Sequence, residues 1–574
     1  MQSIPPQHFS SGVVTYAVSA PLFLCVARRH WLFSPSWQLL RSTCDFHFHR
    51  PDFSERADMI RMERRRFLTG GVSAAALAAV ARGRLAPWLM AETLPRRLAT
   101  DPRRPQYHLL PAANWMNDPN GPIYFGGQYH MFFQYNPEGA FWGDMHWDHA
   151  VSADMVHWKH LPVALAPTPG GPDADGCFSG TAAILDGRVV MLYTGVKAAP
   201  ESQATIKDGL HSLRETQCLA TANDPQLRSF TKLAAPVIAA PPPGLAVHGF
   251  RDPSPWRQGA WWYAVIGSGI EGKAGAVLLY KSRDLRHWEF LHILVQREGS
   301  IALPAEQQAP REVWECPEFF ALGNKHVLIY STSGKSYWME GSLDAGTMEF
   351  RPETAGRLDY GSFYAPKTQL DKAGNRILWG WIPEARPEAE YKAAGWAGMM
   401  SLPRVLTTGG DGRLRMGVAA EVNQLRQREQ ALDVTADEEQ NQRQIDAMRI
   451  AGCAGEIHCL ARRSEQPFEL SLRGAEGSAE TWLSLRYDPQ HPSQILVDGE
   501  PLPLGMDEDL DLHLYIDGSV TEVFVNHQAA RTRRFYYAGD SVPAVRLQWT
   551  GKTAAIRSLA VWDLAPISPD RLTN

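Results

Sequence analysis

The sequence lacks the features of several common protein classes. Its formal net charge is only −5 over 574 residues, and no long basic run suggests nucleic acid or an anionic surface as a partner. The seven cysteines are scattered, and none forms a CxxC or Cys/His cluster with metal-ligand spacing. We therefore expect no nucleic-acid partner and no metal centre. The one close pair, Cys453 and Cys459, leaves a disulfide open as an alternative, but we expect two free buried thiols.

Long apolar runs and long helical patterns are also missing. The apolar run at residues 13–27 is short for a membrane span and is interrupted by Pro21, so we expect no stable membrane insertion. Between residues 107 and 404 no long amphipathic helical pattern occurs. Short runs rich in Tyr, Trp, Val and Ile stand there instead, bounded by Gly, Asn, Asp and Pro, which is typical of an all-β protein.

An export signal is predicted near the start of the chain. Residues 64–68 read Arg-Arg-Arg-Phe-Leu, and a run of small and apolar residues follows, ending Ala-Val-Ala at 79–81. This pattern fits a signal peptide, and the paired arginines before Phe-Leu resemble the bacterial twin-arginine type. We expect residues 59–81 to be the signal and residues 1–58 to be a non-native or disordered extension. The mature protein is then exported, to the periplasm or outside the cell.

Repeated segments predict the architecture of the first large region. Five strand-like segments recur at intervals of roughly 50 to 75 residues, at 128–135, 188–194, 261–267, 326–331 and 376–382. A more literal repeat relates Ser-Ala-Asp-Met-Val-His-Trp at 152–158 to Ser-Arg-Asp-Leu-Arg-His-Trp at 282–288. Such recurrence in an all-β region predicts a five-bladed β-propeller over residues 105–416.

The composition changes after the predicted propeller. Residues 417–431 are polar and are predicted to be a linker, as are residues 82–104 before the propeller. Beyond, apolar and polar residues alternate and Asp517-Gly518 gives a turn signal. We predict an antiparallel β-sandwich over residues 432–566 and a tail at 567–574. The strands expected in the sandwich are 468–473, 481–487, 512–516 and 520–525.

Three acidic segments place a carboxylate beside Trp, Arg or Pro. They are Trp-Met-Asn-Asp-Pro-Asn-Gly at 115–121, Phe-Arg-Asp-Pro at 250–253 and Trp-Glu-Cys-Pro-Glu-Phe-Phe at 314–320. Glycoside hydrolysis needs two carboxylates, one to attack or stabilise the sugar and one to protonate the leaving oxygen. Each segment alone also fits a bland structure: an Asx turn, a local ion pair or a strand-edge glutamate.

In order and wording, the three segments resemble the signature of glycoside hydrolase family 32, the β-fructofuranosidases. The resemblance covers about residues 105–566 and implies a five-bladed propeller followed by a β-sandwich, with no metal or organic cofactor. It implies that Asp118 is the nucleophile, Glu315 the general acid and base, and Asp252 the transition-state stabiliser. Glu318 ranks second to Glu315 as the acid. The substrate-binding residues that it implies are Asn117, Gln134, Trp142, Phe178, Ser179, Arg251 and Trp381.

Further short motifs resemble one subgroup of the family and imply additional pocket residues. Residues 314–317, 378–382 and 395–404 look more like the plant and fungal branch of the family than the intracellular sucrose-phosphate hydrolases. Asp148 stands where the family more often has Gly. Residues 359–365 and the pair Gly380-Trp381 are implied to complete the rim of the pocket.

The sequence therefore predicts an exported, retaining exo-β-fructosidase, monomeric or homodimeric, that acts on sucrose or on the terminal fructose of inulin or levan. A fructosyltransferase on the same site is the nearest alternative. A non-catalytic sugar-binding or sensing protein is an alternative of another class, against which the intact set of carboxylates argues. A five-bladed enzyme acting on arabinan or xylan fits less well, because of the Asn-Asp-Pro-Asn-Gly segment and the expected sandwich.

Overall fold

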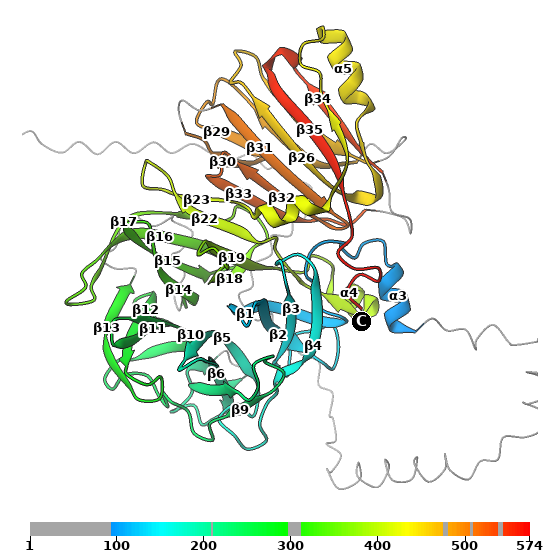
Figure 1. Ribbon diagram of the computed structural model, residues 1–574. Helices are drawn as coiled ribbons and strands as arrows, with labels where there is room; N and C mark the ends of the chain where they lie inside the picture. Colours follow the sequence, from blue (N-terminus) through cyan, green and yellow to red (C-terminus); the bar gives the residue numbers. More distant parts are fainter. Residues whose placement is uncertain are drawn as a thin grey trace, which may run out of the picture. The chain divides into compact units, whose positions relative to one another are not determined.

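The computed structural model describes residues 93–207, 211–296, 312–474, 480–505, 509–537 and 544–573. The predicted N-terminal extension and export signal lie outside these residues. Within them, strands dominate and helices are few and short (Figure 1). No helix in the described part of the chain is both long and apolar enough to span a membrane.

Five sheets follow one another along the chain and form the blades of a β-propeller (Figure 1). Blade I comprises β1 (Asn114–Phe125), β2 (Gln128–Asn136), β3 (His146–Ser152), β4 (Trp158–Leu165) and the late strand β20 (Trp396–Ala397). Blade II comprises β5 (Cys177–Leu185), β6 (Arg188–Ala198), β7 (Ile206–Lys207), β8 (Ser212–Ala222) and β9 (Phe230–Lys232). Blade III comprises β10 (Val247–Gln258), β11 (Trp261–Ile270), β12 (Gly275–Ser282) and β13 (Trp288–Gln296).

The last two blades complete the set. Blade IV comprises β14 (Glu315–Leu322), β15 (Lys325–Thr332), β16 (Lys335–Leu343) and β17 (Phe350–Arg357). Blade V comprises β18 (Tyr364–Leu370), β19 (Arg376–Ile382), β21 (Met399–Met400), β22 (Arg404–Thr408) and β23 (Leu414–Val418). The first strands contact one another in the order β1, β5, β10, β14 and β18, and β18 contacts β1 again. The blades therefore form a closed ring.

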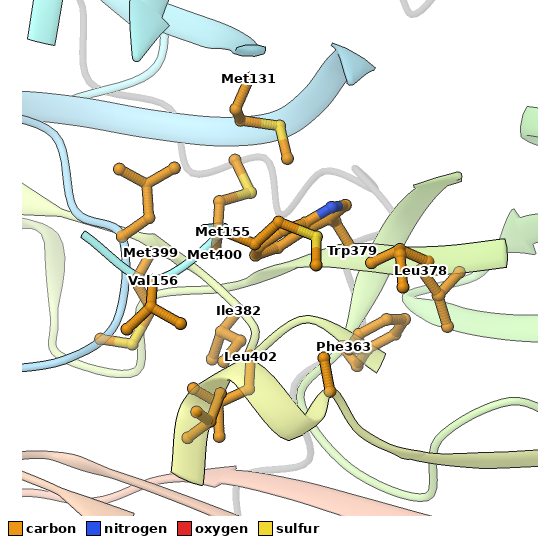
Figure 2. Close-up of a cluster of buried hydrophobic side chains, with 14 of the residues drawn as sticks. Met131, Met155, Val156, Phe363, Leu378, Trp379, Ile382, Met399, Met400 and Leu402 are labelled. Carbon is orange, nitrogen blue, oxygen red and sulfur yellow. The ribbon is translucent and has the colours of Figure 1, made fainter. Parts of the chain in front are cut away.

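The ring closes at a seam between blades I and V. Strand β20 lies between β19 and β21 of blade V in the chain but pairs in parallel with β1 of blade I. Methionine and aromatic side chains from both blades fill this seam (Figure 2), and the Trp158 and Trp379 rings meet edge to face at 5.6 Å. Flexible methionines suit such a place, because they fill irregular gaps between two sheets. The labelled side chains are Met131, Met155, Val156, Phe363, Leu378, Trp379, Ile382, Met399, Met400 and Leu402.

The five repeated segments of the sequence are the second strands of the five blades, β2, β6, β11, β15 and β19. Their residues are mostly buried, because each strand lies between the first and third strands of its sheet and between two neighbouring blades. The predicted five-bladed propeller followed by a sandwich is confirmed.

The literal repeat also has a structural meaning. In blade I, Asp154 Oδ1 accepts hydrogen bonds from the backbone N–H groups of Val156 and His157 at 3.0 and 2.8 Å, in the turn between β3 and β4. Asp284 does the same for Arg286 and His287, both at 2.9 Å, between β12 and β13 of blade III. The repeated residues therefore build the same turn twice.

Two six-stranded sheets form the sandwich (Figure 1). One sheet has the order β24 (Arg426–Ala431), β35 (Ile556–Leu564), β26 (Ala454–Ala461), β31 (Leu510–Asp517), β32 (Val520–Val525) and β33 (Ala529–Arg534). The other has the order β25 (Arg449–Ile450), β34 (Val545–Thr550), β27 (Phe468–Arg473), β28 (Thr481–Tyr487), β29 (Gln494–Val497) and β30 (Glu500–Pro503). Side chains of both sheets meet in one apolar core that includes Ile457, Leu470 and Leu514. Cys453 and Cys459 belong to this core and are free thiols, as expected.

Some segments expected to be linkers are structured. Helix α3 (Leu94–Thr100) lies within residues 82–104. Within residues 417–431, the 3₁₀ helix η3 (Ala420–Leu425) leads into β24, which pairs with β35 of the sandwich. Strand β24 lies at a sheet edge, and most of its side chains are half-buried or exposed. Its sequence is therefore polar and does not show the apolar pattern of a strand. The other helices of the described residues are α4 (Glu388–Ala394), α5 (Glu438–Ala447), η4 (Ala451–Cys453) and η5 (Thr553–Ala555).

Buried charges link the propeller to the sandwich. His108, just before blade I, lies 2.8 Å from Asp517 Oδ2 through Nδ1 and 3.0 Å from Glu522 Oε1 through Nε2. Arg404 of blade V donates to Glu522 Oε2 at 2.6 Å and to Asp359 Oδ2 at 2.9 Å. These side chains are at most 1% exposed, so the network is part of the interior.

Candidate active site

A β-bulge interrupts the first strand of every blade. The strand pairing shifts register after Met116 in β1, Phe178 in β5, Arg251 in β10, Glu315 in β14 and Tyr364 in β18. A bulge takes a residue out of the ladder, bends the strand and re-aims a side chain. The first strands line the centre of the ring, so the bulges turn residues of five blades toward one another.

Proline accounts for four of these bulges. Asp118, Asp252, Cys316 and Ala365 are each followed by Pro, which has no N–H group to donate to a ladder. Asp252, Cys316 and Ala365 also have positive φ angles of 63°, 48° and 51°. Residues other than glycine seldom adopt such angles, and they cluster at functional sites.

Asp118 is held by hydrogen bonds around its carboxylate. Ser179 Oγ donates to Asp118 Oδ2 at 2.6 Å, and Asn117 Nδ2 donates to Oδ1 at 3.1 Å. Gln134 accepts from Asn117 at 2.8 Å and donates to Ser179 at 2.7 Å, which closes the circuit. Burial raises the pKa of Asp118, the hydrogen bonds from Ser179 and Asn117 oppose that rise, and the charge of Glu315 adds to it.

Asp252 lies close to Asp118, with a thiol between them. Its Oδ2 accepts a hydrogen bond from the backbone N–H of Cys316 at 2.8 Å, and its own N–H donates to Thr194 Oγ1 at 2.8 Å. Cys316 Sγ lies 3.5 Å from Asp252 Oδ2 and 3.5 Å from Asp118 Oδ2. Burial raises the pKa of Asp252 to about 7, although the Arg251 guanidinium opposes the rise.

Glu315 is partly accessible, with 30% of its side chain exposed. Arg251 donates to its Oε1 through Nη2 at 2.9 Å and Nε at 3.2 Å, and Tyr364 OH donates to its Oε2. Arg251 Nη1 in turn donates to the fully buried Glu215 at 2.6 Å. The rigid fork of Arg251 therefore fixes Glu315 relative to an anchored carboxylate.

Aromatic side chains lie beside these polar groups. Trp142 is 53% exposed, and its ring meets Phe178 at 5.9 Å. Trp381 packs against Trp115 at 6.0 Å, and Trp115 Nε1 donates to Asn117 Oδ1 at 2.7 Å. The predicted substrate-binding residues therefore gather with the three carboxylates, and the arrangement offers apolar faces next to carboxylates that can attack, stabilise and protonate.

Some sequence-based expectations fall outside this site. Glu318 is 4% exposed and fully engaged behind the bulge, with Ser254 Oγ at 2.8 Å and Thr368 Oγ1 at 2.9 Å as donors, so it cannot present a proton to a substrate. Asp359 does not reach the rim, because it pairs with Arg404 in the contact with the sandwich. Gly380 gives room to the buried Phe363 ring.

Asp148 lies on β3 inside blade I. Its carboxylate is 4.0 Å from His160 Nδ1, and burial raises the pKa of Asp148 to about 7. This carboxylate therefore belongs to the interior of the blade.

Sequence reasoning missed three functional neighbours. Glu215 sits in the third strand of blade II, and nothing in its local sequence marks it as the anchor of Arg251. Cys316 and Lys367 were not singled out either. The signal that could have found Cys316 is the repeated X-Pro dipeptide in the first strands, which marks the bulge that brings its thiol to Asp118 and Asp252.

Metal binding has no geometric support in the described part of the chain. No three side chains of His, Cys, Asp or Glu are placed there to hold an ion together.

Comparison with known proteins identifies the family. Residues 108–417 match the family described as "Glycosyl hydrolases family 32 N-terminal domain", and residues 421–563 match "Glycosyl hydrolases family 32 C terminal". "Sucrose-6-phosphate hydrolase" of Escherichia coli is 34% identical over 489 residues, covering 80% of this chain and 94% of that protein. "Beta-fructofuranosidase 1" of Zea mays is 32% identical over 515 residues, covering 75% and 74%. Because both branches match at similar identity, the plant and fungal branch stays a prediction.

Solved structures agree with the fold. The GH32 β-fructofuranosidase BmSUC1 of Bombyx mori is 30% identical and has a TM-score of 0.66, covering 82% of this chain and 96% of that one. Both the sequence match and the structural match span the propeller and the sandwich together. The chain belongs to glycoside hydrolase family 32.

Proposed function

We propose that this protein is a retaining, exo-acting β-fructosidase that hydrolyses terminal non-reducing β-D-fructofuranosides of sucrose or fructans. One observation carries the proposal: Asp118, Asp252 and Glu315 come from three blades and meet at proline-containing bulges, where Cys316 and Arg251 connect them. Family members named for sucrose-6-phosphate hydrolase and β-fructofuranosidase activity support it.

In the first step, Asp118 attacks the anomeric carbon of the fructosyl unit. The donors Ser179 and Asn117 hold the Asp118 carboxylate in one orientation, so the nucleophile is already positioned when the sugar binds. Glu315 protonates the leaving oxygen, and its exposed edge gives the leaving group a way out. Asp252 faces the positive charge that develops on the sugar ring in the oxocarbenium-like transition state.

In the second step, water releases fructose from the covalent fructosyl-enzyme. Glu315, now ionised, removes the proton from that water while Arg251 and Tyr364 hold the carboxylate in place. A retaining mechanism places the two reacting carboxyl groups about 5 to 5.5 Å apart, whereas an inverting one leaves about 6.5 to 9.5 Å for a water. We expect the short separation between Asp118 and Glu315.

Ligands bound to relatives and the exposed Trp142 both indicate the class of substrate. A mutant of the silkworm enzyme was solved with sucrose, and a variant of fructan 1-exohydrolase IIa of Cichorium intybus, 25% identical, was solved with 1-kestose. Both ligands end in a fructofuranosyl unit. The exposed Trp142 offers an apolar face beside the carboxylates, where the rest of such a substrate can stack.

Product analysis tests this function. The purified protein is incubated with sucrose, sucrose 6-phosphate, inulin and levan, and the products are followed by chromatography and by NMR of the first anomer released. Release of free fructose as the β-anomer is expected. Oligosaccharides formed as the main product would make it a fructosyltransferase, binding without turnover would make it a sugar-binding protein, and an inverted anomer would overturn the mechanism.

We also propose export through the predicted signal at residues 59–81. The support is the sequence pattern alone, since these residues lie outside the described part of the chain. Mass spectrometry of the protein from the native host tests the proposal. A mature chain beginning near Arg82 is expected, and peptides from residues 1–50 in the exported protein would refute it.

A further inference from the structure

The candidate site holds more negative than positive groups. Its three carboxylates are backed by two more, Glu215 behind Arg251 and Glu318 behind the bulge of β14. Among the described residues, Arg251 and Lys367 form ion pairs with this set. Like charges crowded in a buried space disfavour ionisation of each carboxylate, so each cation matters for the ionised state of the whole set.

Lys367 lies directly behind the reacting groups. Its side chain is fully buried on β18, where the strand pairing resumes after the bulge of blade V. The ammonium is 3.1 Å from Glu318 Oε1 and 3.5 Å from the carbonyl oxygen of Pro317. It therefore contacts the backbone of the segment that carries Glu315 and Cys316.

Glu318 fastens this lysine to the rest of the ring. Its Oε1 accepts from Ser254 of blade III at 2.8 Å and from Thr181 of blade II at 3.4 Å. Its Oε2 accepts from the Thr368 N–H at 3.2 Å and hydroxyl at 2.9 Å, in blade V. One carboxylate of blade IV thus joins four of the five blades and binds Lys367 at the same time.

We propose that Lys367 is a positioning residue for the reaction: held by Glu318, its buried ammonium fixes the bulge that carries Glu315 and Cys316, and its positive charge favours the ionised form of the neighbouring carboxylates. The proposal rests on the β-fructosidase function proposed above. It gives Glu318 a role distinct from that of an acid catalyst.

The charges around Asp252 set the direction of the effect. Burial, Asp118 and Glu315 disfavour its ionised form, whereas Arg251 and Lys367 favour it. Cys316 is neutral there, since burial raises the pKa of its thiol. Removing the positive charge of Lys367 therefore moves the acid limb of the activity profile to higher pH. Removing the negative charge of Glu318 moves it to lower pH, because Lys367 still faces the other carboxylates and stays charged.

Lys367→Met provides the first test, because Met keeps the length of the side chain and removes the charge. The wild-type protein is first shown to hydrolyse sucrose, and kcat/KM is then measured from pH 4 to 8. We expect the acid limb of Lys367→Met to move up by about one pH unit, a tenfold loss of kcat/KM below the limb, with kcat affected more than KM. Lys367→Arg, which keeps the charge, should recover the position of the limb.

Glu318→Gln provides the second test, with the opposite sign. The amide keeps the volume of the carboxylate, and its carbonyl oxygen can still accept the hydrogen bond from Ser254, while its NH2 group then faces the Thr368 N–H, so a thermal melt is measured beside activity. We expect the acid limb to move down. Lys325→Met is the matched control, since Lys325 pairs with Glu353 at 2.5 Å on the outside of blade IV. The acid limb of its kcat/KM profile should stay where it is in the wild type.

The outcomes separate this proposal from the proposed function. If the wild type does not release fructose from any of the sugars, the proposed function fails. If the wild type is active but both charge variants only lower the melting temperature and leave the acid limb in place, Lys367 and Glu318 are structural and this proposal is overturned. An upward shift in Glu318→Gln would overturn it as well, and that variant decides the matter even if Lys367→Met does not fold.

Discussion

Single residues at the site depend on donors from other blades. Asp118 of blade I is held by Ser179 of blade II, and Asp252 of blade III is held by the N–H of Cys316 of blade IV. Such arrangements cost little reorganisation during a reaction, because each group is already fixed by packing. They also make each carboxylate sensitive to substitutions far away in the sequence.

Loss of either reacting carboxylate should stop turnover without unfolding the protein. We expect Asp118→Ala and Glu315→Ala each to lower kcat on sucrose by at least about 10³-fold, since each step of the reaction needs both groups. Thermal melts are measured beside activity. Glu289→Ala, which removes a carboxylate with a 67% exposed side chain, is the control and should keep full activity. Full activity with a normal melt in either site variant would contradict the assignment.

Asp252 should destabilise the fold at neutral pH. Its pKa rises from an ordinary 3.8 to about 7 on folding, because burial disfavours the charged form. Between these values the unfolded chain releases its proton and the folded chain keeps it, so stability falls as pH rises from about 4 to 7 and then stays level. We expect Asp252→Asn to raise the melting temperature by a few degrees at pH 7.5 and not at pH 4, while kcat falls steeply. Equal melts at both pH values would contradict the argument.

At the scale of elements, two turns are stabilised in the same way, by an aspartate that accepts backbone hydrogen bonds. Asp154 and Asp284 each cap a turn between the third and fourth strands of a blade, and Met155 and Leu285 take the same positive φ, near 60°. We expect Asp154→Ala and Asp284→Ala each to cost about 1 to 2 kcal/mol of stability through the lost hydrogen bonds. Sucrose hydrolysis at 25 °C should stay unchanged. Denaturant unfolding measures the cost, and Asp→Asn variants, which keep an acceptor, should lose less.

The strands were more predictable than the site. The second strands of the blades are visible in the sequence because their apolar runs act locally, and the segment at 152–158 is visibly repeated at 282–288, although no turn is predicted for it. The polar strand β24 and helix α3 were read as linkers, since an edge strand and a short helix carry little apolar pattern. Glu215, Lys367 and the engaged state of Glu318 could not be foreseen, because they depend on which blades become neighbours in the ring.

At the scale of the whole molecule, buried charges join the propeller to the sandwich. Removing one partner of a buried pair leaves a charge without compensation, which typically costs about 3 to 5 kcal/mol. Glu522 is bonded to both His108 and Arg404, and Arg404 reaches on to Asp359. The network does not include the carboxylates of the candidate site, so its disruption should lower stability and leave catalysis of the folded enzyme intact.

The stabilising effect of this contact is lost at alkaline pH, because it depends on protonated His108. Burial alone would lower its pKa, but the hydrogen bonds to Asp517 and Glu522 outweigh burial and raise the pKa from 6.5 to about 9. The group is protonated more readily when folded, so its contribution is complete below pH 6.5 and is lost as pH rises through 9. The full contribution is at most about 3 to 4 kcal/mol, from about 1.4 kcal/mol per pKa unit. The wild-type melting temperature should therefore fall between pH 7 and pH 9.5.

Replacing His108 tests this dependence. We expect His108→Gln to melt lower than the wild type at pH 6 and to show a flatter decline from pH 7 to 9.5, because the glutamine has no proton to lose. His287→Gln, at an 88% exposed side chain, is the matched control and should follow the wild type. Initial rates of the folded variant at 25 °C should stay within about twofold of the wild type, since His108 does not contact the residues of the candidate active site. Parallel melting curves for wild type and His108→Gln across this range would show that His108 is neutral in the fold, and would contradict the charged contact proposed for it.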